Sequence, residues 1–320
     1  MQPFRFLKEA GRAVFQDRYV KRASDMLREW DGKDGGSIGI IGVPLSKSSI
    51  SHSGAVFAPG VIRKMLSSYS TYSIEEDIDL LDSVITDYGD IVMHPTDIVE
   101  SQKRIAETME QLVVVHPDAL LIVLGGDHSI SFPAVSGFKK RWKKIGVIQF
   151  DAHHDLRNLE DGGPTNGTPF RNLIESDVLK GSHLIQIGIR DFMNSKTYTE
   201  YGKEHGISIY TMKDVRNRDI KEIIKESVQQ LEKEVDAIYV SVDMDVLDQA
   251  YAPGCPAIGP GGMESASLLD AVALLGEYDI VKAMDIVEID PTIDFRDMTS
   301  RTAAWVIMQF LKGKKKAGWI

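Results

Sequence analysis

The chain has 320 residues, of which 43% are hydrophobic and 26% are charged. These values are ordinary for a globular protein and exclude a disordered or collagen-like chain. The 37 Lys and Arg against 47 Asp and Glu give a formal net charge of −10, which opposes a general attraction to nucleic acid or to an anionic membrane. The longest apolar run, residues 119–124, is far shorter than the roughly 20 residues of a membrane span. We therefore expect a small-molecule substrate, with no nucleic acid and no membrane as partner.

The cysteine content and the N-terminal residues indicate the compartment. Cys255 has no second cysteine with which to pair, which suits a reducing compartment. The first 22 residues are basic and partly amphipathic, but Glu9 and Asp17 interrupt them and no apolar signal core follows. We expect a cytoplasmic protein in which residues 1–35, approximately, form a helical extension.

Short runs of apolar and β-branched residues recur along the chain and predict buried strands. In chain order these runs cover residues 38–43, 119–124, 145–150, 184–189, 207–210, 237–242 and 280–287. Between them, apolar residues recur with helical spacing, for example within 98–113 and 220–231. Strands that are apolar on both faces and alternate with helices indicate a mainly parallel sheet covered on both sides. Because the sequence shows no internal repeat or Pro/Ser-rich linker, we expect residues 1–320 to form a single three-layer α/β/α domain.

Polar clusters directly follow four of the predicted strands. The sequence GGDH occupies 125–128, DAHHD occupies 151–155, DMD occupies 243–245, and Glu288 follows the last run. In open α/β sheets, ligands bind beyond the carboxyl ends of the strands. The four clusters are therefore expected to converge on one site.

Common nucleotide-binding and hydrolase motifs are missing or misplaced. The sequence has no GxxxxGK[ST] and no GxGxxG after a predicted strand. Residues 35–39 match GxSxG, but this serine precedes a strand, whereas a nucleophile elbow follows one. These observations disfavour nucleotide binding and a serine hydrolase.

The cluster at 151–155 has the spacing of metal ligands. If strand geometry continues beyond residue 150, Asp151, His153 and Asp155 lie on one side and His154 lies on the other. Three groups that can bind a metal ion then point together.

Two further clusters complete a set of four carboxylates and two imidazoles. Asp243 and Asp245 repeat the same spacing, and His128 follows a glycine pair that permits close backbone approach. Four buried carboxylates repel one another strongly, and two divalent cations would balance them. Oxygen and nitrogen ligands without sulfur favour Mn²⁺, with Fe²⁺, Co²⁺, Ni²⁺ and Zn²⁺ as alternatives.

In their order along the chain, GGDHS, DAHHD, SVDMDVLD and DIVEIDP resemble the motifs of the ureohydrolases. This family includes arginases, agmatinases and formimidoylglutamases, and the resemblance extends from about Ile38 to the C-terminus. It implies an arginase-like α/β/α domain with a parallel eight-stranded sheet, a homo-oligomer, and two Mn²⁺ ions per subunit. One ion would be bound by His128, Asp151, Asp155 and Asp243. The other would be bound by His153, Asp151, Asp243 and Asp245.

The same resemblance implies a reaction in which a metal-bridging hydroxide attacks an amidine or guanidine carbon. Glu288 would accept hydrogen bonds from the substrate nitrogens, and the amine would leave after its nitrogen is protonated. Arginases and agmatinases transfer this proton with a histidine, where this chain has Asn166. Since an amide cannot shuttle a proton, Asp155, the metal-bound water or solvent must do so, and Asn166 is a candidate substrate-binding residue.

The loop after Asp155 bears on the choice of substrate. Arginase-like members have an Asn two residues beyond this Asp, whereas this chain has Arg157, a cation that suits an acidic substrate. The sequence NLEDGGPTNGTPFR at 158–171 most resembles the formimidoylglutamases. That branch cleaves N-formimidoyl-L-glutamate to L-glutamate and formamide in histidine degradation. Arg171 and Arg190 are alternative residues for binding the substrate carboxylates.

Other functions stay open on the sequence alone. A guanidino-acid hydrolase or an agmatinase-like enzyme of the same family would release urea, although the sequence QAYAPGCPAIGPGG after Asp248 differs from the corresponding loop of agmatinases. A regulatory homologue without activity would have no need of the intact ligand set. A metal-dependent deacylase on a related fold would have no evident use for Glu288.

Overall fold

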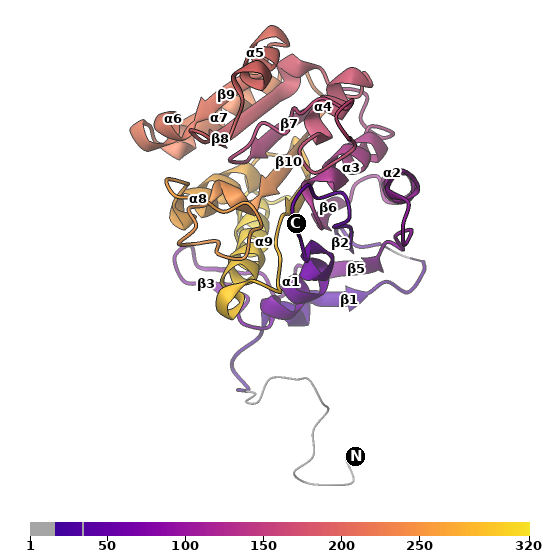
Figure 1. Ribbon diagram of the computed structural model, residues 1–320. Helices are drawn as coiled ribbons and strands as arrows, with labels where there is room; N and C mark the ends of the chain where they lie inside the picture. The colour runs from indigo at the N-terminus through magenta and orange to yellow at the C-terminus, as the bar shows by residue number, and fades with distance from the viewer. Residues whose placement is uncertain (1–16, 34) are drawn as a thin grey trace.

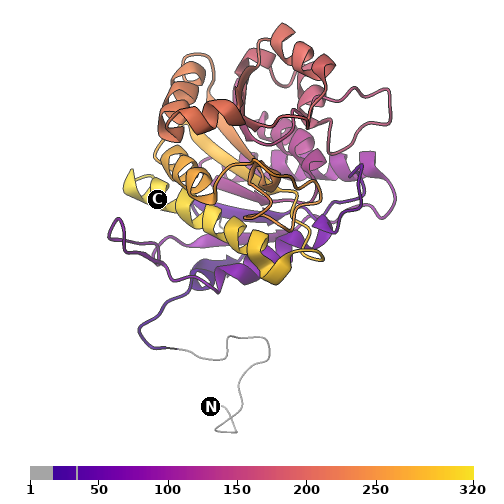
Figure 2. The same ribbon diagram turned by 60° about the vertical axis from the view of Figure 1, so that its left-hand side comes forward.

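The computed structural model describes residues 17–33 and 35–320. Its centre is a nine-stranded sheet between two layers of helices (Figure 1, Figure 2). In spatial order the strands are β1 (Leu27–Glu29), β5 (Ile85–Asp90), β2 (Ile38–Gly42), β6 (Leu120–Leu124), β11 (Val281–Val287), β10 (Ala237–Asp243), β7 (Ile145–Phe150), β8 (Leu184–Ile189) and β9 (Ser208–Thr211). All neighbouring strands in this sheet are parallel. The predicted α/β/α architecture with a mainly parallel sheet is confirmed.

The expected count of eight strands is wrong, because β1 adds a ninth strand at the edge of the sheet. This strand has three residues and pairs only with β5. The search for apolar runs misses both β1 and β5. The sequence ITDYGD of β5 becomes polar and exposed toward its carboxyl end, and LRE of β1 is largely exposed. The search for runs that are apolar on both faces therefore misses the two strands at the β1 edge, which carry polar and exposed residues.

The described part of the N-terminal extension contains no α-helix. Residues 17–33 instead contain the 3₁₀-helix η1 (Ala23–Met26) and strand β1. Ala23 and Met26 are buried, so this part of the chain packs against the rest of the fold. Residues 1–16 of the predicted helical extension lie outside the described residues. That the whole chain forms a single domain stays a prediction, which the joining of β1 to the common sheet supports.

Helices cover the two faces of the sheet as separate layers (Figure 1). One layer contains α1 (Ala58–Leu66), α6 (Met212–Asn217), α7 (Ile220–Leu231), α8 (Ser265–Gly276) and α9 (Met298–Lys316). The other contains α2 (Ile98–Val115), α3 (Ser131–Phe138), α4 (Pro169–Glu175) and α5 (Lys196–Glu204). Each layer packs a hydrophobic core against its face of the sheet.

The two helices expected from apolar spacing, α2 and α7, are present. Each begins after an aspartate that accepts a hydrogen bond from the main chain of the first turn, Asp97 for α2 and Asp219 for α7. Such caps satisfy main-chain N–H groups that have no partner inside the helix. Capping and one buried apolar face together explain why these segments are helical.

Short elements connect the layers. Strands β3 (Tyr72–Ser73) and β4 (Ile78–Asp79) form a small antiparallel pair. The other 3₁₀-helices are η2 (Ala55–Phe57), η3 (His128–Ile130), η4 (Gly181–His183), η5 (Met244–Val246) and η6 (Phe295–Asp297). In the described part of the chain, no helix combines the length and the apolar character needed to cross a membrane.

The order of the strands brings the polar clusters together. Strands β6, β11, β10 and β7 are consecutive neighbours in the sheet. These are the four strands that GGDH, Glu288, DMD and DAHHD follow. Because all four strands run in the same direction, their carboxyl ends meet at one edge of the sheet.

Candidate active site

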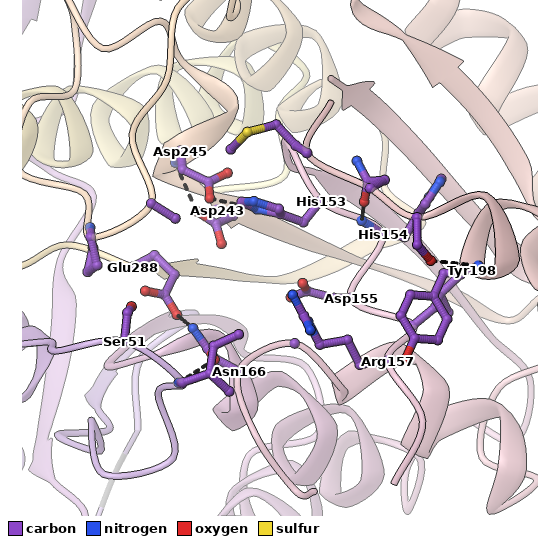
Figure 3. Close-up of a pocket in the computed structure, with 18 residues that line it drawn as sticks. Ser51, His153, His154, Asp155, Arg157, Asn166, Tyr198, Asp243, Asp245 and Glu288 are labelled. Carbon is purple, nitrogen blue, oxygen red and sulfur yellow. Dashed lines mark hydrogen bonds and ion pairs between the residues drawn. The ribbon is translucent and has the colours of Figure 1, made fainter. Parts of the chain in front are cut away.

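A pocket of about 280 Å³ lies at this edge of the sheet (Figure 3). Side chains at the carboxyl ends of β7, β10 and β11 and in the segments that follow line it, and residues 50–51, 166–167, 193–195 and 198 complete its wall. The predicted residues His153, Asp155, Asp243, Asp245 and Glu288 are all in the lining. The convergence expected from the sequence is therefore observed.

His128 is at the centre of one group of candidate metal ligands. Its Nδ1 lies 3.1 Å from an oxygen of Asp151, 2.8 Å from one of Asp155 and 3.1 Å from one of Asp243. The ligand atoms of His128, Asp151 and Asp243 lie within 4.8 Å of one another, and all three residues are buried. Within residues 17–33 and 35–320, Nδ1 of His128 has no partner in hydrogen-bonding geometry. One nitrogen facing three carboxylates is an arrangement that a cation would stabilise.

His153 is at the centre of a second group that shares Asp151. Its Nδ1 lies 2.9 Å from an oxygen of Asp245 and 3.4 Å from one of Asp151. The ligand atoms of these three residues also lie within 4.8 Å of one another. Asp151 therefore belongs to both groups, as expected for a residue between two ions.

Burial and mutual charge shift the pKa values within this cluster. Burial and the carboxylates of Asp245 and Asp151 raise the pKa of Asp243 well above its usual range. Burial would lower the pKa of His153, but Asp245 and Asp151 outweigh it and raise this pKa to about 12. The Asp155 carboxyl also lies close to other charges: burial and Asp151 raise its pKa to about 6. Without a metal ion, protonated imidazoles thus compensate the carboxylates, and a metal ion must displace those protons when it binds.

A layer of buried polar groups behind the cluster orients its members. The Gln149 amide donates a hydrogen bond of 2.7 Å to Asp151. The Nε2 atom of His128 lies 2.9 Å from the Ser241 hydroxyl, which donates in turn to Asp285 at 2.7 Å. The sequence analysis considered only polar residues that follow the strands, so it missed Gln149, Ser241 and Asp285. A signal was present, because each is a polar residue that is fully buried within a largely apolar strand.

His154 turns away from the cluster, as the alternation along 151–155 predicts. Its Nδ1 lies 2.7 Å from the side-chain oxygen of Gln186, and its Nε2 lies 3.1 Å from the Thr199 hydroxyl. The physical reason differs from the expected one, because β7 ends at Phe150 and the cluster lies in a loop. Asp155 within that loop has a φ of 52°, a left-handed conformation that is uncommon outside glycine.

Glu288 lines the pocket, and one oxygen of its carboxylate, Oε2, is buried. Its other oxygen, Oε1, accepts hydrogen bonds from the His128 main chain at 2.8 Å and from the Asn166 amide at 3.1 Å. No polar atom of the described residues contacts Oε2 in hydrogen-bonding geometry. Burial, with the nearby charge of Asp127, raises the pKa of Glu288 to about 8. A cationic group beside Oε2 would favour the ionised form.

Two of the four candidate substrate-binding residues line the pocket, namely Arg157 and Asn166. The guanidinium of Arg157 points toward the middle of the pocket (Figure 3). Arg157 is the only Arg or Lys among the described lining residues, and it has no ion pair with any described residue. It is thus free to bind an anionic group of a ligand.

The structure gives the other two arginines different partners. Arg171 pairs with Glu175 and stacks on the Tyr201 ring, with its guanidinium carbon 3.8 Å from the ring centre. Arg190 is buried and donates to main-chain carbonyls of the loop after β10, including those of Asp245 and Gly259. Neither residue lines the pocket. Each guanidinium is thus already used within the fold, and of the three arginines only Arg157 lines the pocket.

The sequence analysis missed several residues of the pocket wall. Ser51, Met193, Tyr198 and Pro256 line it without belonging to a recognised motif. They come from loops, where only proximity to the carboxyl edge of the sheet could have indicated them. Tyr198 differs, since it lies in the first turn of α5, the helix that follows β8.

The sequence matches the Arginase family over residues 36–312. This match spans most of the chain and agrees with the sheet order and the carboxylate–imidazole cluster. The chain belongs to the arginase family.

Within the family, the chain is most informatively compared with formimidoylglutamases. The formimidoylglutamase of Halalkalibacterium halodurans is 60% identical over 314 residues, 98% of each chain. The crystal structure of formimidoylglutamase from Bacillus subtilis matches with a TM-score of 0.95 at 51% identity, over 98% of this chain and 97% of that chain. Formiminoglutamase from Trypanosoma cruzi, in a structure with Mn²⁺, matches with a TM-score of 0.80 at 23% identity, over 87% of this chain and 93% of that one. The predicted resemblance to formimidoylglutamases is confirmed.

The buried Glu288 carboxyl predicts a stability gain in the metal-free Glu288→Gln variant. The pKa of this group is raised in the folded protein, so its ionisation opposes folding. The loss of folding stability caused by this ionisation is absent below pH 4.5, the pKa of Glu in the unfolded chain. It grows as pH rises and reaches its full size above about pH 8. Urea unfolding should show the variant to be more stable by an amount on the order of a few kcal/mol at alkaline pH, and about equal at acidic pH. Equal stability at alkaline pH would contradict the argument.

The two ligand groups predict the metal content of substituted proteins. Asp243→Ala and Asp151→Ala should each reduce bound metal strongly, because each residue contributes to a buried ligand group. His154→Ala is the matched control, since its imidazole faces Gln186 and Thr199, and should retain the wild-type content. Elemental analysis after gel filtration measures the difference. Full metal occupancy in the Asp243→Ala protein would refute the assignment.

Proposed function

We propose that this chain hydrolyses the C–N bond of N-formimidoyl-L-glutamate to give L-glutamate and formamide, in histidine degradation. The observation that carries the proposal is that one pocket contains both Glu288 and Arg157. Among the described residues, Oε2 of Glu288 has no hydrogen-bond partner and the Arg157 guanidinium has no ion pair. The substrate has the matching charges, a cationic amidine and two carboxylates, of which the side-chain carboxylate lies farther from the amidine. The 60% identity to a formimidoylglutamase supports the same substrate.

Six residues fit a pair of Mn²⁺ ions in this proposal. They are His128, Asp151, His153, Asp155, Asp243 and Asp245. When bound, two such ions would lower the pKa of a water between them, which supplies hydroxide at neutral pH. Oxygen-rich ligation without sulfur supports manganese, and the T. cruzi relative was solved with this metal.

Glu288 has the task of holding the amidine carbon in place. Its Oε1 is fixed by the His128 main chain and the Asn166 amide, so Oε2 presents a lone pair at a fixed position. A hydrogen bond from a cationic amidine nitrogen to this carboxylate is charge-assisted and directional. Such an interaction orients the carbon toward the nucleophile and accounts for part of the rate enhancement.

The departing amine of glutamate needs a proton. Asn166 cannot supply one, because its amide does not titrate and is already hydrogen-bonded to Glu288. Asp155, which lines the pocket, a metal-bound water or solvent must therefore supply it, and Asp155 is the candidate among the side chains. Water addition and loss of this amine together balance the reaction, with formamide as the second product.

Arg157 is the residue that we assign to a substrate carboxylate. A guanidinium provides two parallel N–H donors that match the two oxygens of a carboxylate. An arginine at this position disfavours agmatine, which has no carboxylate. We further propose a cytoplasmic homo-oligomer, and the buried free thiol of Cys255 supports the reducing compartment.

Product analysis tests the proposed function directly. The manganese-loaded protein is incubated separately with formimidoylglutamate, guanidinobutyrate, arginine and agmatine, and the products are identified by mass spectrometry. We expect formamide and glutamate from the first compound, and little or no urea from the others. Urea as the main product would instead establish a guanidino-acid hydrolase or agmatinase.

Metal removal should abolish this activity reversibly. Exhaustive chelation followed by dialysis is expected to leave an inactive protein, and Mn²⁺ should restore formamide release better than Mg²⁺ or Zn²⁺ because of the ligand set. The assay is run together with elemental analysis of each sample. Undiminished turnover in protein that contains no metal would rule out the proposed chemistry.

Substitution of Arg157 should weaken binding more than turnover. Arg157→Leu leaves a substrate carboxylate unpaired, at a cost of about 2–4 kcal/mol, or roughly 30- to 1000-fold in kcat/KM. Most of the loss should be in KM, since the carboxylate is remote from the reacting carbon. Arg157→Lys should recover only part of it.

Arg171→Leu serves as the matched control, because its guanidinium pairs with Glu175 outside the pocket. Its KM should stay near the wild-type value. If KM rose strongly for Arg171→Leu and stayed unchanged for Arg157→Leu, binding of the substrate carboxylate would be assigned to Arg171 instead.

A further inference from the structure

Gly167 lies directly against the side chain of Arg157. A Cβ atom placed on Gly167 would lie 2.6 Å from Cδ of Arg157 and 3.0 Å from its Nε. Both distances are shorter than the roughly 3.5–4.0 Å of an ordinary contact between carbon atoms. The main chains of the two residues are also joined, because the Arg157 N–H donates to the Gly167 carbonyl at 2.9 Å. Only glycine therefore permits the observed path of the arginine into the pocket.

The loop around Gly167 is fixed, so an added methyl group would displace the arginine and leave the loop in place. The Thr165 main-chain N–H donates to the Thr168 hydroxyl at 3.0 Å, and this hydroxyl donates back to the Thr165 carbonyl at 2.9 Å. Gly167 and Thr168 are buried. Arg157, in contrast, has an exposed side chain. Since Gly167 is not among the residues with positive φ, alanine at this position introduces no backbone strain.

The preceding residue fixes the opposite end of the pocket. Asn166 donates to Oε1 of Glu288 at 3.1 Å, and its own side-chain oxygen accepts from the Ile50 main chain at 3.0 Å. Glu288 and Arg157 lie at opposite sides of the pocket in Figure 3, with Asn166 below and between them. Two consecutive residues of one loop thus contact the two groups that would bind the two ends of the substrate.

We infer that Gly167 is a positioning residue: the space beside it lets Arg157 reach into the pocket, and the resulting separation from Glu288 selects the length of the substrate between its amidine and its side-chain carboxylate. This inference rests on the proposed function, in which Glu288 binds the amidine and Arg157 binds a carboxylate. It adds to that proposal a residue that determines which substrate length is preferred, a selection that neither Glu288 nor Arg157 provides alone. Residues that set geometry through others act mainly on binding when the group they move is remote from the chemistry.

The test uses full-length, manganese-loaded protein and three substrates that differ by one methylene. These are the N-formimidoyl derivatives of L-aspartate, L-glutamate and L-2-aminoadipate. For Gly167→Ala we expect KM for the glutamate compound to rise by roughly tenfold while kcat changes by less than about threefold, and the preference among the three compounds to shrink. Gly60→Ala is the matched control, because Gly60 lies in α1 with nothing within 4 Å of its added Cβ, and its kinetics should equal those of the wild type.

A double-mutant cycle separates positioning of Arg157 from a general structural effect. In an Arg157→Ala background, Gly167→Ala should have no further effect on KM, since its target side chain is gone. An equal effect of Gly167→Ala in both backgrounds would overturn the inference, as would an unchanged KM and substrate preference in the single variant. Melting temperature and manganese content of every variant show whether the fold and the metal centre are retained. A wild-type protein that cleaves none of the three compounds would refute the proposed function itself, which is a different outcome.

Discussion

The structure depends on one electrostatic constraint, the burial of four carboxylates and two imidazoles at the carboxyl ends of neighbouring strands. Asp151 and Asp243 are almost wholly inaccessible to solvent and lie close to a second acid or to His128. Such a cluster is unfavourable unless positive charge is present. In the protein chain alone, protonated imidazoles provide that charge, as the raised pKa of His153 shows. The strand order, the apolar layers and the buried amide of Gln149 all maintain this arrangement.

At the same edge of the sheet, residues of the proposed reaction have strained main-chain conformations and a buried polar atom without a partner. Asp155 and Glu288 both have positive φ values, 52° and 60°, a conformation that costs about 1 kcal/mol or more in a residue other than glycine. Glu288 additionally keeps a buried carboxylate oxygen without a partner in the described part of the protein. Local strain and unsatisfied polarity at one place are typical of a site that is completed by its ligands. Arg157, at the other side of the pocket, supplies the opposite charge.

Much of this arrangement could be predicted from the sequence, because its causes are local. Apolar runs predicted seven of the nine strands of the central sheet, and polar clusters after four of them predicted the site. Edge strand β1 could not be found in this way, because a strand with one neighbour and exposed side chains has no distinctive pattern. The arginines show a second limit. Arg157, Arg171 and Arg190 are alike in sequence, and only the fold shows that two of them are bound to Glu175 and to main-chain carbonyls.

Anomalous diffraction from manganese-loaded crystals, recorded at the manganese absorption edge, would test the central claim most directly. The account predicts two anomalous peaks about 3.5–4 Å apart, one bound to Nδ1 of His128 and one bound to Nδ1 of His153, with Asp151 between them. A single peak, or peaks distant from both imidazoles, would contradict it.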